Sequence, residues 1–140
     1  MPGSDDGDTF HIAVRVYHED VDTQGVVYHA NYLRFMERAR TEWLRSLGVE
    51  PDQLSAREQI LFTIAELTIK YKLPARFNDV LRVGVRIRRL GRVSLNIEQH
   101  IERESSELIC RAEVKIACVN AQHFRPHPIP SFLLVEIEKA

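Results

Sequence analysis

The residues best suited to chemistry lie in one acidic segment, His18 to Gly25, which contains the carboxylates Asp20 and Asp22. A carboxylate can attack an activated carbonyl carbon directly, or it can act as a general base that deprotonates a water molecule. Gly25 ends the segment and lets the backbone approach a bound molecule closely. Asp is also common before helices as a cap or turn residue. From the spacing alone, this structural role is favoured for Asp22.

A long amphipathic helix is predicted directly after this segment, over residues 30–47. Its apolar residues recur at steps of three and four, which trace one face of an α-helix: Tyr32, Phe35, Met36, Ala39, Trp43, Leu44 and Leu47. The first N–H groups of a helix lack intrahelical partners and lie at the positive end of its dipole, so they can stabilise an oxyanion. Val27, Tyr28 and His29 occupy the positions where such amides are expected.

The remaining pattern predicts a sheet. Alternating apolar residues indicate strands over residues 10–17, 60–73, 80–90, 93–102 and 108–119. A short helix is expected over 51–56, and for 131–139 a short helix is favoured over a strand. The strand at 60–73 is apolar on both faces, which suits a central position. Hairpin connections imply an antiparallel sheet, with the long helix packed on one face. Covering the other face predicts a homodimer or a homotetramer.

Composition excludes several classes of function. The 140 residues suit one domain over 10–140, preceded by a disordered tail at 1–9. A net charge of −1 argues against nucleic acid, and the short apolar stretches argue against membrane insertion. Because no signal peptide is evident, we expect a cytoplasmic protein in which Cys110 and Cys118 are reduced core residues. The sequence has no paired Cys/His set and no nucleotide-binding loop, so we expect no metal and no cofactor.

The segment from Val14 to Arg40 contains the pattern Asp20-x-Asp22-x-x-Gly25-x-Val27-Tyr28-His29-x-x-Tyr32. It resembles the hotdog thioesterases of the 4-hydroxybenzoyl-CoA thioesterase type, in particular the Tol-Pal-associated acyl-CoA thioesterase branch. The resemblance continues through Tyr71-x-x-Pro74-Ala75-Arg76 and into the last strand. It implies an α+β hotdog fold, in which a curved five-stranded antiparallel sheet wraps one long central helix. It also implies active sites at a subunit interface and a thioester substrate of coenzyme A or acyl carrier protein.

The resemblance also implies roles for individual residues. The catalytic carboxylate of the family falls on Asp22, and the full motif outweighs the turn interpretation. Asp20 is expected to be a loop or surface carboxylate that shapes the turn. His29 is a candidate partner for Asp22 or hydrogen-bond donor to the substrate, and its alternative is a first-turn residue at the dimer interface. His18 occupies a position where this branch often has an aromatic hydroxyl, so we assign it no catalytic role.

Two groups of residues are candidates for binding the substrate. One follows the catalytic loop and is expected to shape the acyl site: Gly25, Val27, Tyr28 and Tyr32. Tyr28 is read as pocket wall or interface, and Tyr32 as core or pocket lining. The other consists of basic residues that could bind the phosphates of coenzyme A: Arg88, Arg89 and Arg92 at one turn, with Lys70, Lys72 and Arg76 as a second patch. For both patches, a solvated surface is the alternative.

Two other functions remain open from the sequence. A dehydratase acting on 3-hydroxyacyl thioesters would need a His paired with a second acid across the dimer, and His29 keeps this alternative open. A non-catalytic or weakly catalytic module would bind acyl carrier protein, phospholipid-synthesis enzymes or Tol-Pal proteins through its basic hairpin. The loop context of Asp22 favours hydrolysis over the dehydratase, whereas hydrolysis and the binding role are not exclusive.

Overall fold

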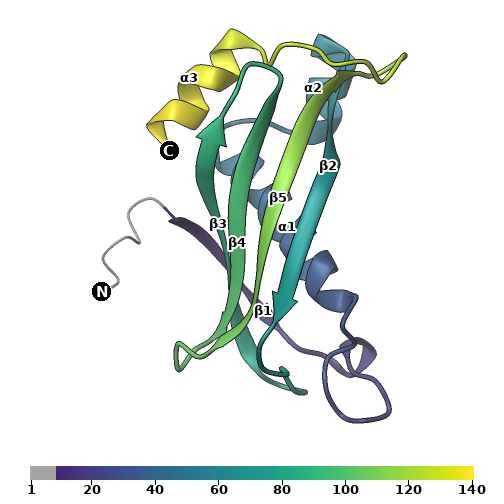
Figure 1. Ribbon diagram of the computed structural model, residues 1–140, viewed down its shortest axis with the longest axis vertical. Helices are drawn as coiled ribbons and strands as arrows, with labels where there is room; N and C mark the ends of the chain where they lie inside the picture. The colour runs from purple at the N-terminus through teal and green to yellow at the C-terminus, as the bar shows by residue number, and fades with distance from the viewer. Residues whose placement is uncertain (1–8) are drawn as a thin grey trace.

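The structure is a computed structural model that describes residues 9–140. Its elements, in order, are β1 (Thr9–Arg15), the 3-10 helix η2 (His18–Asp20), α1 (Asn31–Ser46), α2 (Pro51–Glu58), β2 (Ile60–Tyr71), β3 (Val80–Leu90), β4 (Ser94–Arg103), β5 (Leu108–Asn120) and α3 (Ser131–Lys139). The five strands form one antiparallel sheet, with α1 behind it in Figure 1. The predicted α+β class is therefore confirmed.

One expectation about the element plan needs correction. Besides α1, the described part of the chain has two short α-helices close to those that the sequence pattern predicts, so the family picture of one long central helix is incomplete. α1 is the longest at 16 residues, and α2 and α3 have eight and nine. The tail expected at residues 1–9 lies outside the described residues, apart from Thr9, which begins β1. No helix within residues 9–140 is long and apolar enough to cross a membrane.

α1 forms because one of its faces is continuously apolar, and this face packs against β1, β3 and β4. Five of the seven predicted contact residues are buried: Tyr32, Phe35, Met36, Ala39 and Trp43. The helix ends before Gly48, whose φ of +86° lies in the left-handed region that favours glycine. The predicted helix and its inward face are thus confirmed to within a residue or two.

The position of β2 differs from the prediction. The strand order is β1-β3-β4-β5-β2, so β2 is an edge strand that pairs with β5 alone. Its apolar residues on both faces suggested a central position, but several of them are only half-buried or exposed in the chain, including Ile64, Leu67, Ile69 and Tyr71. The apolar pattern indicates that both faces of the strand are suited to burial, but it does not indicate which strands are its neighbours in the sheet.

A polar residue connects the sheet to the helix. Gln99 on β4 is fully buried on the face that α1 covers. Its Nε2 donates to the carbonyl oxygen of Met36 at 3.0 Å, and its Oε1 accepts from Nη1 of Arg40 at 2.9 Å. Because a buried amide without partners is strongly unfavourable, these two bonds favour one position of α1 along the sheet.

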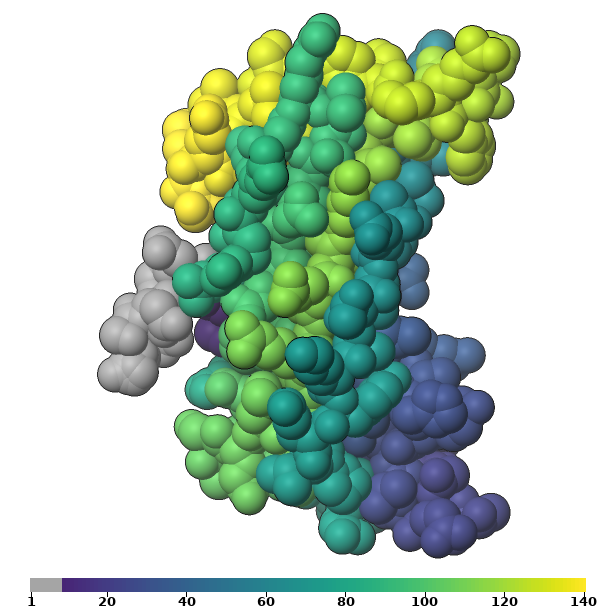
Figure 2. Space-filling view, viewed as in Figure 1, coloured from purple at the N-terminus to yellow at the C-terminus, as the bar shows by residue number. Residues whose placement is uncertain are grey.

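The opposite face of the sheet is charged. Glu98 on β4 forms ion pairs with Arg88 of β3 and Arg111 of β5, and Arg82 pairs with Glu102 at 2.7 Å. Figure 2 shows the side chains of β3, β4, β5 and β2 on this face, with α1 largely hidden behind them. This face therefore presents paired charges to its surroundings, whereas the apolar surface faces α1.

We predict that the core beneath α1 supplies much of the stability. Phe35→Ala should lower the free energy of unfolding by about 3–5 kcal/mol, because Phe35 is 0% exposed and its removal leaves a cavity. Phe132→Ala on α3, where the ring is 51% exposed, should change it by about 1 kcal/mol at most. Urea unfolding followed by circular dichroism, at equal protein concentrations, measures both. Equal losses in the two variants would contradict this assignment of the core.

Candidate active site

Asp22 lies in a tight turn between η2 and α1. Its Oδ1 accepts a hydrogen bond from the backbone N–H of Gln24 at 2.8 Å, and its carbonyl oxygen accepts from the N–H of Gly25 at 3.0 Å. Its own N–H donates to the carbonyl oxygen of Val26 at 2.9 Å. Gly25 has a φ of +80°, which a residue with a side chain would adopt only with strain. The turn role of Asp22 is therefore real, and it holds a half-buried carboxylate in one place.

Asp20 is buried, in contrast to the expected surface position, and is only 6% exposed. Its Oδ2 accepts from the N–H of Tyr17 at 2.8 Å, and its Oδ1 accepts from Nδ2 of Asn31 at 2.9 Å. Its carbonyl oxygen accepts from the N–H of Tyr28 at 2.9 Å. The other expectation, that Asp20 shapes the turn, agrees with these bonds. Both carboxylate oxygens of Asp20 therefore have donors, and Asp22 is the more exposed of the two carboxylates.

The amides expected to stabilise an oxyanion are only partly available. The N–H of Val27 donates to the carbonyl oxygen of Ala75 at 2.9 Å, and that of Tyr28 donates to Asp20. These two amides are thus committed to the fold, which corrects the expectation for both. The backbone N–H groups of His29 and Ala30 make no hydrogen bond within residues 9–140. They immediately precede α1, where the helix dipole favours negative charge.

The side chain of His29 is exposed and lies among tyrosines. Its ring centroid is 4.6 Å from that of Tyr28 and 6.2 Å from that of Tyr71. The hydroxyl of Tyr71 donates to the carbonyl oxygen of His29 at 3.1 Å. No hydrogen bond joins the imidazole to Asp22 in the described part of the chain, so the structure does not support the expected pairing of these two side chains. Tyr71 is a neighbour that residue-by-residue reasoning missed, although it opens the second half of the family motif.

Two of the candidate substrate-binding residues, Val27 and Tyr32, lie in the core. Val27 is buried, and the buried hydroxyl of Tyr32 accepts from the N–H of Ala75 at 3.0 Å. Burial raises the pKa of Tyr32, so it stays neutral at physiological pH. The core alternative therefore fits Tyr32. Gly25 and Tyr28 are the two candidates that remain open at the surface.

The basic candidates divide between the two ends of the sheet. Arg88 and Arg92 lie at the β3–β4 turn, next to α3, whereas the segment with Asp22 lies at the far end in Figure 1. Arg88 is also paired with Glu98 at 3.5 Å. Arg76 lies closer to Asp22, because it forms an isolated antiparallel bridge with Val26. Within one chain, Arg76 is thus the exposed basic residue that the fold brings beside the turn.

A cavity of about 360 Å³ lies between α1, α2 and β2. Its lining is mostly apolar and includes Trp43, Leu54, Ile60 and Phe62, with the half-buried Arg40 at its polar side. Arg40 is nine residues beyond the start of α1, which corresponds to roughly 14 Å along the helix axis.

Among residues 9–140, no group of three or more His, Cys, Asp or Glu side chains is arranged to hold a metal ion.

Comparison with known proteins shows the family of the chain. The family model of the thioesterase-like superfamily matches residues 16–137. The chain belongs to the thioesterase-like superfamily. It is 38% identical over 130 residues to the acyl-CoA thioester hydrolase YbgC of Escherichia coli O6:H1, which covers 93% of this chain and 96% of that protein. It is 39% identical over 121 residues to the acyl-CoA thioesterase YbgC of Haemophilus influenzae, covering 86% and 88%.

A solved structure shares the architecture as well. A probable thioesterase from Bartonella henselae superimposes with a TM-score of 0.83 at 34% identity, covering 87% of this chain and 99% of that one. The resemblance inferred from the Asp20–Tyr32 motif is thereby confirmed, and so is the hotdog architecture. At the level of the superfamily, the expectation of a thioester-hydrolysing enzyme is confirmed too.

We predict that neither cysteine takes part in chemistry. Both are buried, and burial raises the pKa of Cys110 to about 12 and that of Cys118 to about 11. At pH 8 both are therefore thiols rather than reactive thiolates. A disulfide reagent such as dithiobis(nitrobenzoate) should leave the native protein unlabelled over minutes and modify two thiols per chain in urea. Prompt modification of the native protein would contradict this.

Proposed function

We propose that this chain is an acyl-CoA thioesterase, which hydrolyses a thioester to a free acid and coenzyme A with Asp22 as general base or nucleophile. The observation that carries the proposal is the half-buried Asp22 carboxylate, held by a tight turn directly before α1. The two relatives named as acyl-CoA thioesterases support the same reaction. Asp20 is unsuitable, because its carboxylate oxygens already accept two hydrogen bonds.

The reaction can proceed in two ways from Asp22. As a general base, Asp22 takes a proton from water while the water oxygen adds to the thioester carbonyl carbon. The resulting tetrahedral oxyanion collapses, the carbon–sulfur bond breaks, and the proton passes to the sulfur of coenzyme A. As a nucleophile, Asp22 forms a mixed anhydride and releases the thiol, and water then hydrolyses the anhydride. Each route consumes one water and regenerates the carboxylate.

The backbone N–H groups of His29 and Ala30 are the donors best placed to stabilise the oxyanion. Both lack partners within the described residues and lie at the positive end of the α1 dipole. Fixed amide donors of this kind act where charge develops in the transition state, and removing one typically lowers the rate about 10²- to 10³-fold. The exposed imidazole of His29 then contacts the substrate rather than Asp22.

We propose that Asp22→Asn removes most of the turnover and preserves the fold. Asparagine keeps an oxygen that can accept the hydrogen bond from Gln24, but it cannot take up a proton or attack a carbonyl. The kcat should fall by about 10²- to 10⁴-fold. Thiol release from short, long and aromatic acyl-CoA thioesters measures it, and Asp52→Asn on the exposed surface of α2 serves as the matched control. Wild-type turnover in Asp22→Asn would overturn the role of this residue.

The same experiment separates the alternative functions. Hydration of an enoyl-CoA without thiol release would indicate the dehydratase. Absence of turnover with every thioester, together with salt-sensitive binding of acyl carrier protein, would favour the non-catalytic module. A cytoplasmic location and a connection to the Tol-Pal system stay predictions. Arg88 and Arg92 also stay predictions as phosphate ligands, and their place at the far end of the sheet favours contact with a substrate bound at another subunit.

A homodimer built on β2 completes the proposal. β2 is the edge strand that packs against α2, and its outer backbone groups have no strand partner within residues 9–140. A long, apolar edge strand is prone to pair with another chain. Ile64 is 41% exposed on this strand, and Tyr71 at its end contacts the ring of His29. Pairing of β2 with a second β2 would cover this edge and bring a second chain close to the site.

We predict that Ile64→Lys weakens this dimer. A lysine in place of the exposed isoleucine puts a charge into the apolar contact, where it would be desolvated. Light scattering after size-exclusion chromatography should give a dimer or tetramer for the wild type and a smaller mass for the variant. Val135→Lys makes the same change at an exposed position on α3 and should leave the mass unchanged. An unaltered mass for Ile64→Lys, or a monomeric wild type, would contradict the proposal.

A further inference from the structure

The loop that follows β2, residues 74–79, is bonded to both ends of the segment with Asp22. Before Asp22, the N–H of Val16 donates to the carbonyl oxygen of Asp79, and the N–H of Asn78 donates to that of Val16, both at 2.9 Å. After Asp22, the N–H of Val27 donates to the carbonyl oxygen of Ala75 at 2.9 Å. Because Val16 and Val27 are both bonded to this loop, the position of residues 17–26 between them depends on the position of the loop.

Ala75 links the loop to α1 as well. Its N–H donates to the buried hydroxyl of Tyr32, while its carbonyl oxygen accepts from Val27. One residue of the loop therefore contacts both the helix whose start offers the free amides and the strand-like stretch that leaves the Asp22 turn. A shift of Ala75 would change the distance between the carboxylate and those amides.

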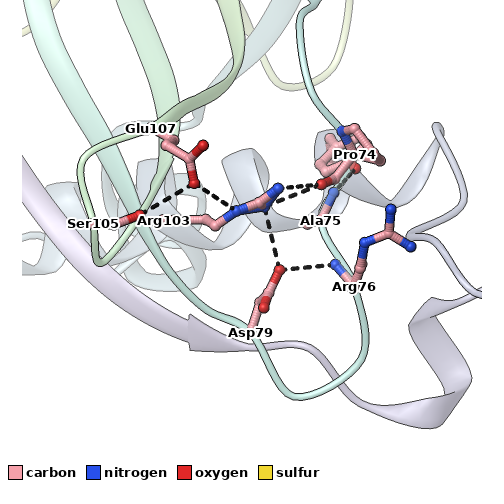
Figure 3. A network of polar contacts seen from close by, with 8 residues as sticks. Pro74, Ala75, Arg76, Asp79, Arg103, Ser105 and Glu107 are labelled. Atoms are coloured by element: carbon pink, nitrogen blue, oxygen red, sulfur yellow. Dashed lines mark hydrogen bonds and ion pairs between the residues drawn. The ribbon is translucent and has the colours of Figure 1, made fainter.

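Arg103, the last residue of β4, holds this loop (Figure 3). Its Nη1 and Nη2 both donate to the carbonyl oxygen of Pro74, at 3.1 and 2.7 Å. Nη1 also lies 3.4 Å from Oδ2 of Asp79, so one guanidinium contacts both ends of the loop. Nε lies 3.3 Å from Oε1 of Glu107, which orients the guanidinium from the other side.

This arrangement needs a guanidinium. Asp79 receives the backbone N–H of Arg76 at 2.9 Å on the same oxygen that faces Arg103, so the loop is closed on itself and then held by the arginine. The side chain of Arg103 is only 22% exposed, which lessens competition from water for these contacts. An ammonium carries the same charge but is a point donor, and it cannot reach Pro74, Asp79 and Glu107 with one planar fork.

We propose that Arg103 is a positioning residue for catalysis: through the loop at 74–79 it sets the place of Asp22 relative to the start of α1. The inference rests on the thioesterase function proposed above. Arg103 touches neither the carboxylate nor the free amides, and its effect passes through Pro74 and Ala75. A displacement of about 1 Å at a reacting group can lower a rate about 10²-fold, so loss of this guanidinium should act mainly on kcat.

The first test compares Arg103→Met and Arg103→Lys with Arg82→Met by steady-state thiol release. Arg82 is a control of similar chemistry, because its guanidinium pairs with Glu102 on the charged sheet face. We expect Arg103→Met to lower kcat about 10- to 100-fold with KM changed less than about twofold. Arg103→Lys should recover part of the loss, and Arg82→Met should stay within about twofold of wild type. Unchanged kcat in a folded Arg103→Met would overturn the proposal.

Amide hydrogen exchange provides a second readout that does not need activity. In Arg103→Met, or in Arg103→Lys should the first variant not fold, exchange at Val16 and Val27 should accelerate relative to the core amide of Ile97. In Arg82→Met the exchange rates of all three amides should match those of the wild type. A wild type without turnover would overturn the thioesterase function. The exchange data would then still test whether Arg103 holds the loop. Unaltered exchange at Val16 and Val27 would refute control of the segment by Arg103.

Discussion

The hydrogen bonds that hold the backbone between β1 and α1 decide what the site can do. This stretch of 15 residues crosses one end of the sheet, and its hydrogen bonds to the loop at 74–79 and to Asp20 hold it there. These contacts use the N–H groups of Val27 and Tyr28. They leave free the two amides that follow, those of His29 and Ala30, in the described chain. The same bonds that build the segment therefore also select its donors.

Periodicity predicts this fold well wherever an element buries one face. α1 and β3 to β5 show this, since each alternates or repeats in step with its own geometry, and their bounds agree within one or two residues. The bounds of β2 are predicted as well, but its expected central position is wrong for a physical reason. Two apolar faces indicate burial on both sides, and an edge strand covered by a second chain satisfies that requirement as well as a central strand does. Sequence pattern does not report which strand lies beside it.

At the site, the residues with suitable side chains could be predicted from the sequence, but which backbone N–H groups are already hydrogen-bonded could not. Asp22 and Gly25 stand out by type and spacing, and the turn they form agrees with that expectation. Whether the N–H of Val27 is free depends on the carbonyl of Ala75, 48 residues further along the chain, and no residue type encodes such a bond. The role proposed for Arg103 could not be predicted from the sequence for the same reason. Its partners Pro74 and Asp79 come close to it only when β4 has paired in the sheet.

The two carboxylates of the acidic segment illustrate how a fold assigns separate tasks to similar residues. Asp20 and Asp22 are two positions apart, yet one faces the interior and the other the surface. Burial of Asp20 is tolerable because Tyr17 and Asn31 donate to its two oxygens, and the bond from Tyr28 to its carbonyl adds a third tie to the same residue. Two carboxylates open to one site would repel each other and compete for the same proton. By committing Asp20 to structure, the fold leaves Asp22 as the more exposed carboxylate of the two, which fits the role of general base or nucleophile proposed for it.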